Sequence, residues 1–472
     1  MTERESLLSE LSLDDAIDGN ELNKYHLAQL LIIYSINIFY VSVNQFLNLI
    51  LPALEKEFSL NNFEKSFVGA VEYFGIFIGS ITVHSFADKY GRRKTYLTSI
   101  AIFILFQALT TFSSSFYTFC FLRCLQSIAA TFLMLLAYIL VVEFLPKKYR
   151  GFLSKFFSVL AILGNTFCIS IVMITYDDLI SINWRKFTYV FIVCTSILLI
   201  VAFFVVGESV RYDLFKGDKN RGFNNLNKLR GGKGEIEGET RMRLEVWLSN
   251  FDRELKKNLE VNEDDGKRST FFKLMRGEYK KVTLILIYTW FATTSSSYGI
   301  EFILPIFLQK MSIKTNLEGQ HPLNKLLLSN LYNVPLLLLM IYFTEFEYIG
   351  RKKSLSFFFF LLFASNFLLS LELWPGLLFW LTIIKLCLAA CFMIVYVYTV
   401  ELFPTYLRMA ALGACSGFSR IGQMMSPWMS IYMMDFYIFS PFIVLGIIAL
   451  IASLMILQLP YETKNKKMES LV

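Results

Sequence analysis

The feature that most constrains this chain is a series of apolar segments, each close to the length of a membrane-spanning helix. A helix needs roughly 20 largely apolar residues to cross the hydrocarbon core of a bilayer, and the sequence offers about a dozen such segments. The chain of 472 residues is 55% hydrophobic and only 18% charged, which is too little charge for the surface of a soluble protein of this length. We therefore predict an all-α membrane protein with twelve transmembrane helices. The predicted spans are 27–51, 65–86, 95–113, 118–142, 152–175, 187–206, 282–308, 326–345, 354–371, 376–400, 409–430 and 437–459.

Basic loops set the predicted orientation of these spans. The short loops on one side are rich in Lys and Arg, whereas those on the other side hold few, and it is cytosolic loops that carry such an excess. Both termini are therefore predicted to be cytosolic, which agrees with an even number of spans. The predicted divisions are a cytosolic tail over 1–26, a six-helix bundle over 27–206, a cytosolic linker over 207–281, a second six-helix bundle over 282–459 and a cytosolic tail over 460–472.

Two charged phrases each occur twice, which indicates an internal repeat. Asp88–Lys94 reads D-K-Y-G-R-R-K, and Glu347–Lys353 reads E-Y-I-G-R-K-K about 260 residues later. Glu143–Pro146 (E-F-L-P) has its counterpart in Glu401–Pro404 (E-L-F-P) at nearly the same offset. Landmarks that keep their order and their offset indicate one unit used twice. Repeats of this kind within apolar sequence are typical of secondary transporters.

These phrases together resemble the major facilitator superfamily over essentially the whole chain. Within that family, the two E-x-x-P phrases and the run Tyr396–Glu401 resemble the synaptic-vesicle-2-related proteins. Lys385 and Arg420 are similar to residues of the organic anion transporters. The short predicted loop over 53–64 differs from the large first outer loop of the organic anion and cation transporters, and it favours the synaptic-vesicle-2-related branch.

The resemblance implies a gating role for the repeated charged phrases, in which charge pairs at the cytosolic face hold the two halves closed. Topology alone explains basic residues in a cytosolic loop, and a glycine there permits a tight turn. Topology does not explain the acidic residue three positions before each glycine. The residues assigned to the gate are Asp88, Gly91, Arg92, Arg93, Glu143 and Arg150 in the first half, and Glu347, Gly350, Arg351, Glu401 and Arg408 in the second.

Charged residues within the predicted spans are candidates for substrate or ion contact. Each one costs about 2.5–3.5 kcal/mol at the centre of a bilayer, so it usually faces protein or water. Lys385 and Arg420 suit an anionic substrate, but Glu301 is an equally good internal partner for them. Glu72 is either a proton carrier or an exposed residue toward the outer end of the second span, and the second alternative is favoured.

Five polar residues near the middle of predicted spans have two possible roles. The default role is hydrogen bonding between helices, and the alternative is to line a substrate site midway across the membrane. They are Asn44, Asn48, Tyr298, Asn330 and Asn333. The first span carries no carboxylate at its middle, which argues against proton coupling through that helix. Gly75 and Gly79 form a G-x-x-x-G pair that predicts close packing of two helices.

The sequence excludes several other classes of function. It contains no G-x-x-x-x-G-K-[ST], H-E-x-x-H or G-x-S-x-G motif, which argues against an ATP-driven pump and against an enzyme. The seven cysteines lie in apolar segments and none is near a histidine in sequence, so we predict no metal and no cofactor. The basic residues do not form one face, which argues against nucleic acid as a partner.

We therefore expect a secondary active or facilitative transporter that moves a small organic solute by alternating access. Among such solutes, the sequence favours an organic ion. Expected partners are the solute, protons or another coupling ion as in a symporter, and the lipid bilayer, with the protein acting as a monomer. The alternatives are a transporter-like membrane protein that binds or senses, and a sugar transporter. The membrane is either the plasma membrane or an endosomal or vesicle membrane.

Overall fold

The computed structural model describes residues 22–176, 182–216, 219–230, 241, 274–275, 277–315, 323–343, 350–371, 376–403 and 405–459. Each of the twelve predicted spans falls on one long helix. These helices are α3 (Lys24–Phe58), α4 (Asn62–Tyr90), α5 (Arg92–Thr111), α6 (Phe116–Phe144), α7 (Lys147–Thr175), α8 (Trp184–Val205), α13 (Gly277–Thr315), α14 (Asn324–Phe343), α15 (Arg351–Ser370), α16 (Leu377–Leu402), α17 (Thr405–Phe436) and α18 (Ser440–Leu457). Within the described ranges, nine helices are long and apolar enough to cross a membrane. They are α3 to α8, α15, α16 and α18.

Helix α3 continues to Phe58, where Ser59 in the left-handed region ends it, and side-chain capping begins α4 earlier than predicted. The Asn61 side chain accepts a hydrogen bond from the backbone N–H of Glu64 at 2.9 Å, and the Glu64 carboxylate accepts from the N–H of Asn61 at 3.0 Å. This reciprocal pair satisfies two N–H groups that the first turn of a helix otherwise leaves unpaired. The predicted loop over 53–64 therefore shrinks to the three residues between α3 and α4.

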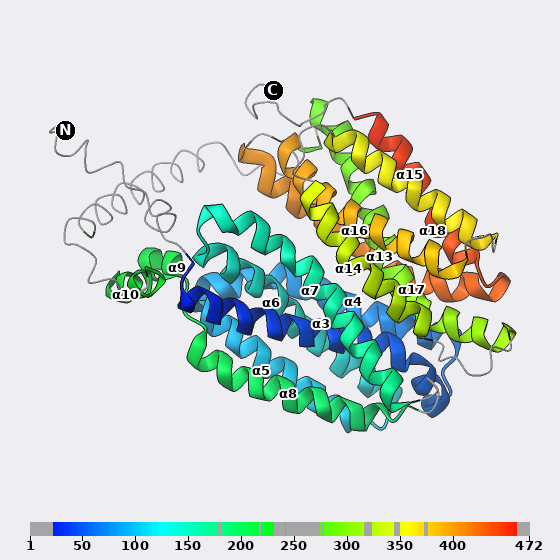
Figure 1. Cartoon of the computed structure of the whole chain (residues 1–472), viewed down its shortest axis with the longest axis horizontal. Helices are drawn as coiled ribbons and strands as arrows, with labels where there is room; N and C mark the ends of the chain where they lie inside the picture. Colours follow the sequence, from blue (N-terminus) through cyan, green and yellow to red (C-terminus); the bar gives the residue numbers. More distant parts are fainter. Residues whose placement is uncertain are drawn as a thin grey trace.

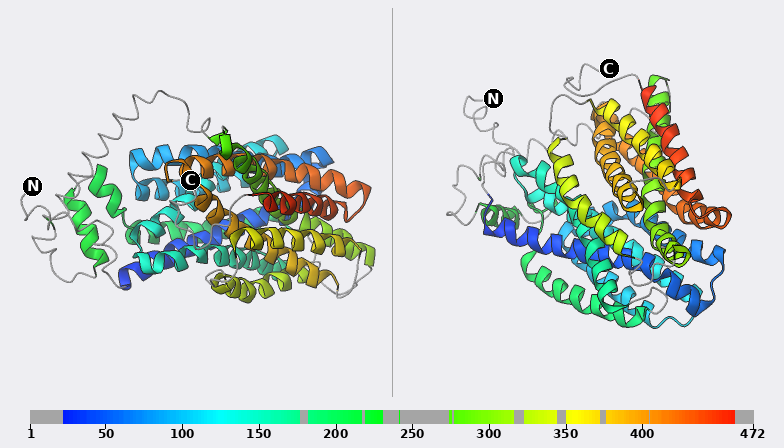
Figure 2. Two further views of the ribbon diagram at one scale, coloured as in Figure 1. Left: turned by 90° about the horizontal axis from the view of Figure 1, so that it is seen from above. Right: turned by 45° about the vertical axis from the view of Figure 1, so that its right-hand side comes forward.

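The helices form two groups that lie side by side (Figures 1 and 2). Helices α3 to α8 pack on one another in one group, and α13 to α18 do so in the other. Contacts between the groups run mainly from α4 to α17 and from α7 to α14, with fewer from α3 to α13. The described structure thus has two halves that meet along a limited set of helices.

Small residues bring α4 and α6 close together, as the G-x-x-x-G pair predicts. A Cβ added at Gly75 would lie 2.5 Å from the carbonyl oxygen of Cys124, and one added at Gly79 would lie 2.7 Å from the Cβ of Thr131. Without the driving force of water, helices in a membrane depend on this kind of close van der Waals contact. The predicted packing role of these glycines is confirmed.

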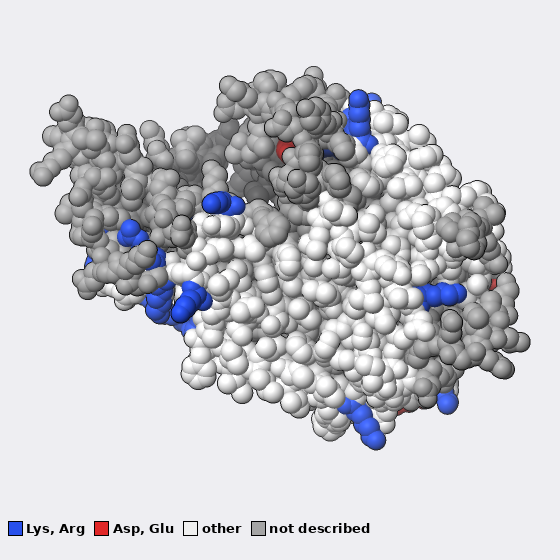
Figure 3. All heavy atoms as spheres, viewed as in Figure 1, with Lys and Arg blue, Asp and Glu red and all other residues white. Residues whose placement is uncertain are grey.

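The exterior of the helices is strongly apolar. Ile174 and Phe204 are 86% and 79% exposed, and Figure 3 shows a largely uncharged middle with Lys and Arg gathered toward the edges. A soluble protein rarely exposes an apolar area of this size. Such a surface is stable when lipid is the solvent.

Two short helices in the predicted linker were not predicted from the sequence. They are α9 (Val210–Lys216) and α10 (Lys219–Leu229), and Figure 1 shows them beside one end of α3. The Asn23 side chain, which caps the start of α3, also donates to the last carbonyl group of α10, on Leu229, at 2.7 Å. One asparagine therefore anchors this helical pair to the first long helix.

Candidate functional sites

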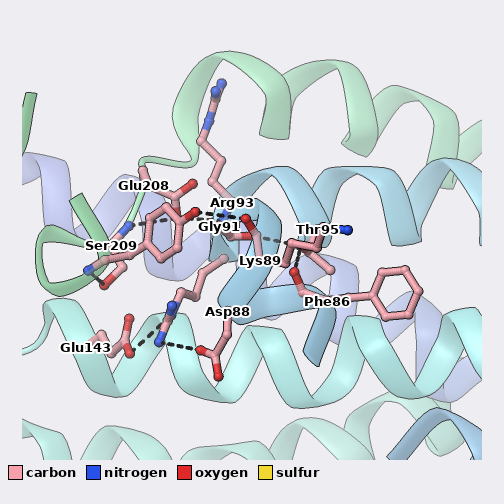
Figure 4. Close-up of polar contacts among 11 residues, drawn as sticks. Phe86, Asp88, Lys89, Gly91, Arg93, Thr95, Glu143, Glu208 and Ser209 are labelled. Carbon is pink, nitrogen blue, oxygen red and sulfur yellow. Dashed lines mark hydrogen bonds and ion pairs between the residues drawn. The ribbon is translucent and has the colours of Figure 1, made fainter. Parts of the chain in front are cut away.

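A charged turn lies between α4 and α5, at the end of the molecule that we call the Gly91 end. Arg92 lies between two carboxylates, 3.3 Å from Asp88 and 3.6 Å from Glu143. Figure 4 shows the two acidic side chains reaching it from α4 and α6. The described contacts of Arg92 therefore join three helices of one half.

Gly91 and Glu208 fix the shape of this turn. Gly91 has φ of 97°, which favours glycine because it has no Cβ. The Glu208 carboxylate accepts hydrogen bonds from the backbone N–H groups of Arg93 at 2.8 Å and Ser209 at 3.1 Å (Figure 4). Burial is the largest influence on this carboxyl and raises the pKa of Glu208 above its ordinary value. The sequence analysis missed this residue, although its position just after an apolar segment was a usable signal.

Arg93 joins the same turn to the end of α8. Its guanidinium donates to the carbonyl oxygens of Val206 and Phe203, each at 2.6 Å. The last carbonyl groups of a helix have no partner within the helix, and a cation there is favourable. The predicted gate residues of the first half therefore form one connected set, except Arg150, whose side chain lies outside the described residues.

The second copy of the charged turn is described only in part. Arg351 lies 3.8 Å from Glu401, which matches the pair between Arg92 and Glu143 in the first half. Gly350 is the N-cap residue of α15. Glu347 and the side chain of Arg408 lie outside the described residues.

A second group of functional candidates, which we call the central cluster, lies where the two halves meet. It consists of Tyr40, Glu72, Tyr73, Tyr298, Glu301, Lys385, Tyr396 and Arg420. The rings of Tyr73 on α4 and Tyr298 on α13 meet edge to face across the halves with centroids 5.4 Å apart. The ring of Phe392 on α16 also meets that of Tyr298 edge to face, with centroids 6.5 Å apart. Both halves therefore contribute to one aromatic and charged site.

Arg420 interacts with neutral partners among the described residues. Its Nη1 donates to Oε1 of Gln423 at 2.9 Å, and it lies in electrostatic reach of Tyr298. It acts electrostatically on Tyr40 and Tyr396 as well. Among the described residues, Arg420 thus lies next to hydroxyl and amide groups.

Lys385 has acidic and amide partners. Its Nζ donates to Oδ1 of Asn330, and it lies in electrostatic reach of Glu301. The Glu301 side chain is exposed. Of the two roles left open for Lys385, this geometry favours internal pairing. Asn333, one turn further along α14, donates to the carbonyl of Ser329 at 2.8 Å.

Glu72 is buried, and its expected exposure near the outer end of the second span is wrong. Only 7% of its surface is exposed, and it lies in electrostatic reach of Arg123 on α6. The close packing of α4 on α6 brings these two residues together. Arg123 in turn donates to Gln126 at 2.8 Å.

The remaining predicted polar residues lie on α3. Asn44 lies beside Tyr40, so it is close to the central cluster, and Asn48 is buried one turn further along. The sequence analysis missed Tyr40, Tyr73 and Tyr396, because a chain that is 16% aromatic gives no reason to single out one ring. In the described part of the chain, no group of His, Cys, Asp and Glu is arranged to hold a metal ion.

Long apolar helices, an apolar exterior and a polar interior between two halves define an integral multi-pass membrane protein. The sequence profile of the Major Facilitator Superfamily matches residues 30–344, and the chain belongs to this family.

The relatives of this chain are transporters. The relative from Danio rerio that is named transporter SVOPL is 27% identical over 96% of this chain and 89% of its own length. An organic cation transporter-like protein from Drosophila melanogaster is 28% identical over 84% of this chain and 67% of its own. The inward-open structure of the xylose transporter XylE from E. coli has a TM-score of 0.73 at 17% identity and covers 94% of this chain and 99% of XylE. The resemblance to the synaptic-vesicle-2-related and organic cation transporter branch is confirmed.

Proposed function

We propose that the protein transports a small organic anion by alternating access, with Arg420 as the residue that binds the anionic group. The supporting observation is the charge balance of the central cluster. Glu301 and Lys385 offset each other, as do Glu72 and Arg123. Arg420 then contributes the net positive charge, next to the aromatic rings of Tyr298 and Tyr396. A carboxylate or sulfonate on an aromatic or apolar body fits such a site.

The proposed topology places twelve spans in the membrane with both termini in the cytosol, and the Gly91 end at the cytosolic face. The bundles over 27–206 and 282–459 would rock against each other about the central cluster, joined by the cytosolic linker over 207–281. The tails are 1–26 and 460–472. The excess of Lys and Arg in the loops of the Gly91 end supports this orientation.

The charged turns of the Gly91 end are expected from the sequence to hold the two halves closed at the cytosolic face, but the described pairs favour a different role in the gate. Each described pair, Arg92 with Glu143 and Arg351 with Glu401, joins helices of one half. Their proposed role is therefore to keep the inner end of each half rigid, so that the half moves as a body. Asp88, Arg93, Arg150, Glu347 and Arg408 complete the proposed sets. The membrane is either the cell surface or an internal vesicle, and the protein acts as a monomer.

The test is uptake into proteoliposomes with a panel of labelled organic anions, cations and sugars. Arg420→Gln removes a charge-assisted hydrogen bond worth about 1.5–3 kcal/mol, so we expect anion uptake at low concentration to fall roughly 10- to 100-fold. Arg420→Lys keeps the positive charge but not the planar set of N–H donors, so its uptake should lie between those of Arg420→Gln and the parent. Arg230→Gln, a change to an exposed arginine on the linker, serves as the control.

The same panel separates the competing functions. If the protein takes up cations or sugars, and Arg420→Gln does not change that uptake, then one of those solutes is the substrate and the anion proposal is wrong. Binding without uptake of any solute would point to a binding or sensing protein instead. Anion uptake with the same KM and rate in Arg420→Gln would remove Arg420 from the site.

Proton coupling through Glu72 is a second proposal, because Glu72 is buried beside Arg123 rather than exposed. A carboxyl group in that position can carry a proton between the two faces while its partner keeps a charge nearby. In a symporter of this design, an inward proton gradient drives accumulation. Glu72→Gln should abolish accumulation against a gradient and preserve exchange at equilibrium. Accumulation that depends equally on the pH gradient in parent and variant would contradict the proposal.

A further inference from the structure

A small cavity with a partly polar lining lies inside the first half, on the side of Arg123. Helices α3, α5, α6 and α8 enclose it, and its polar lining consists of Gln107, Thr110, Arg123, Gln126 and Thr188. The charged and amide residues of this lining are well buried: Arg123 is 7% exposed, and Gln107 and Gln126 are each 2% exposed. A cavity in the apolar interior of a membrane protein would ordinarily be lined by hydrocarbon.

Three buried polar atoms of this lining have no hydrogen-bond partner among the described residues. They are Nε of Arg123, Nε2 of Gln126 and Oε1 of Gln107. The Gln126 amide is oriented by its Oε1, which accepts from Nη1 of Arg123 at 2.8 Å, so its nitrogen is the free donor. Each unsatisfied buried group costs about 1–3 kcal/mol, and three together would be a large cost for one small site.

We propose that this cavity is a binding site for one resident water molecule, which accepts hydrogen bonds from Arg123 and Gln126 and donates one to Gln107. The space open to water is about 10 Å³, which is close to the minimum that holds one molecule, and two to four polar partners are the usual number. Two donors and one acceptor match a water molecule. They disfavour an anion, because the carbonyl oxygen of Gln107 would repel it.

The water gives Arg123 a partner that does not depend on Glu72. Arg123 lines the cavity and is also in electrostatic reach of Glu72. If Glu72 becomes neutral or moves, the guanidinium keeps a hydrogen bond on its cavity side. The site therefore helps to hold a buried positive charge in place, whatever the solute is.

Radiolytic footprinting tests the proposal on the intact protein in detergent. X-ray pulses generate hydroxyl radicals from bound water as well as from bulk water, so a side chain beside a buried water is oxidised although solvent does not reach it. Phe119 lines the cavity and is 1% exposed, whereas Phe359 on α15 is 0% exposed and does not line it. We expect several-fold more oxidation of Phe119 than of Phe359. Equal oxidation of the two rings would overturn the proposal.

Two variants test whether the signal comes from this cavity. Val43→Ile adds one methyl group to the cavity lining and should displace the water, which would lower the oxidation of Phe119 several-fold. Val71→Ile is the matched control, since Val71 does not line the cavity. Gln107→Leu removes the acceptor instead of filling the space and should have the same effect. Unchanged oxidation of Phe119 in both cavity variants would refute the site.

Discussion

Gly91 shows how one residue determines the geometry of the charged turn. Its φ of 97° disfavours side chains, and a Cβ built there would lie 2.6 Å from Oε2 of Glu208. The close approach of Glu208 is required because its carboxylate accepts a hydrogen bond from the N–H of Arg93. The same backbone position therefore permits the turn and admits the acidic group that stabilises it.

We expect Gly91→Ala to destabilise the protein by about 1–2 kcal/mol from backbone strain, with a further loss from the contact with Glu208. The measurement is the melting temperature of the purified protein in detergent. Gly413→Ala is the control, because a Cβ there meets nothing within 4 Å and alanine favours a helix. Equal melting temperatures for the two variants would contradict the role assigned to Gly91.

The burial of Glu208 predicts that the stability of the protein depends on pH. Because burial raises the pKa of its carboxyl above the ordinary value of 4.5, the folded protein binds this proton more tightly than the unfolded chain does. The resulting stabilisation is present below pH 4.5 and is lost as the pH rises through the folded-state pKa. The variant Glu208→Gln does not titrate, so it does not lose stability in this way, and its amide oxygen can still accept a hydrogen bond. Its melting temperature relative to the parent should therefore be higher at about pH 7.5 than at about pH 4. A difference in melting temperature between variant and parent that stays constant with pH would contradict this role of Glu208.

At the scale of helices, the sequence predicted the long helices and the pairing of α4 with α6, because hydrophobic length and small residues are local signals. It misplaced the end of α3, which continues past the apolar stretch to Phe58, and the start of α4, which the Asn61 side chain caps. It missed α9 and α10, whose short sequences have no apolar run and depend on packing of Leu214 and Phe223 and on Asn23 for their position. Charged residues of the central cluster were predicted because charge in a membrane is costly. Their partners were not, since pairing between helices far apart in sequence leaves no local pattern.

Helix α4 packs closely against the other half at Gly69. A Cβ there would lie 2.7 Å from the ring of Phe302 on α13 and 2.8 Å from Cγ of Pro427 on α17. Gly69→Val should therefore hold the halves apart at this point and slow any transport that needs them to meet. Gly417→Val, where a Cβ meets nothing within 4 Å, is the control. We would measure initial uptake rates at equal amounts of reconstituted protein, and an unchanged rate for Gly69→Val would contradict the prediction.

At the scale of the whole molecule, the halves are joined at the end opposite Gly91. Asn62 donates to Asp435 at 2.5 Å, and the ring of Phe63 meets that of Trp428 edge to face at 4.6 Å. Both contacts link the start of α4 to the last turns of α17. If the Gly91 end is cytosolic, these residues close the outer face in the conformation described. A solute can then enter the central cluster from the outer face only if this contact breaks in every transport cycle.

Cross-linking tests that requirement. In the variant Phe63→Cys/Trp428→Cys, a short thiol cross-linker should hold the outer contact closed and stop uptake, and reduction should restore it. Phe86→Cys/Phe132→Cys is the matched pair, because those rings lie 5.6 Å apart within one half and their cross-link leaves the halves free to move. The native cysteines in the described structure are buried or half-buried, and the parent protein treated alike measures their contribution. Full uptake by the cross-linked Phe63/Trp428 variant would show that the outer contact does not need to open, and alternating access about the central cluster would have to be abandoned.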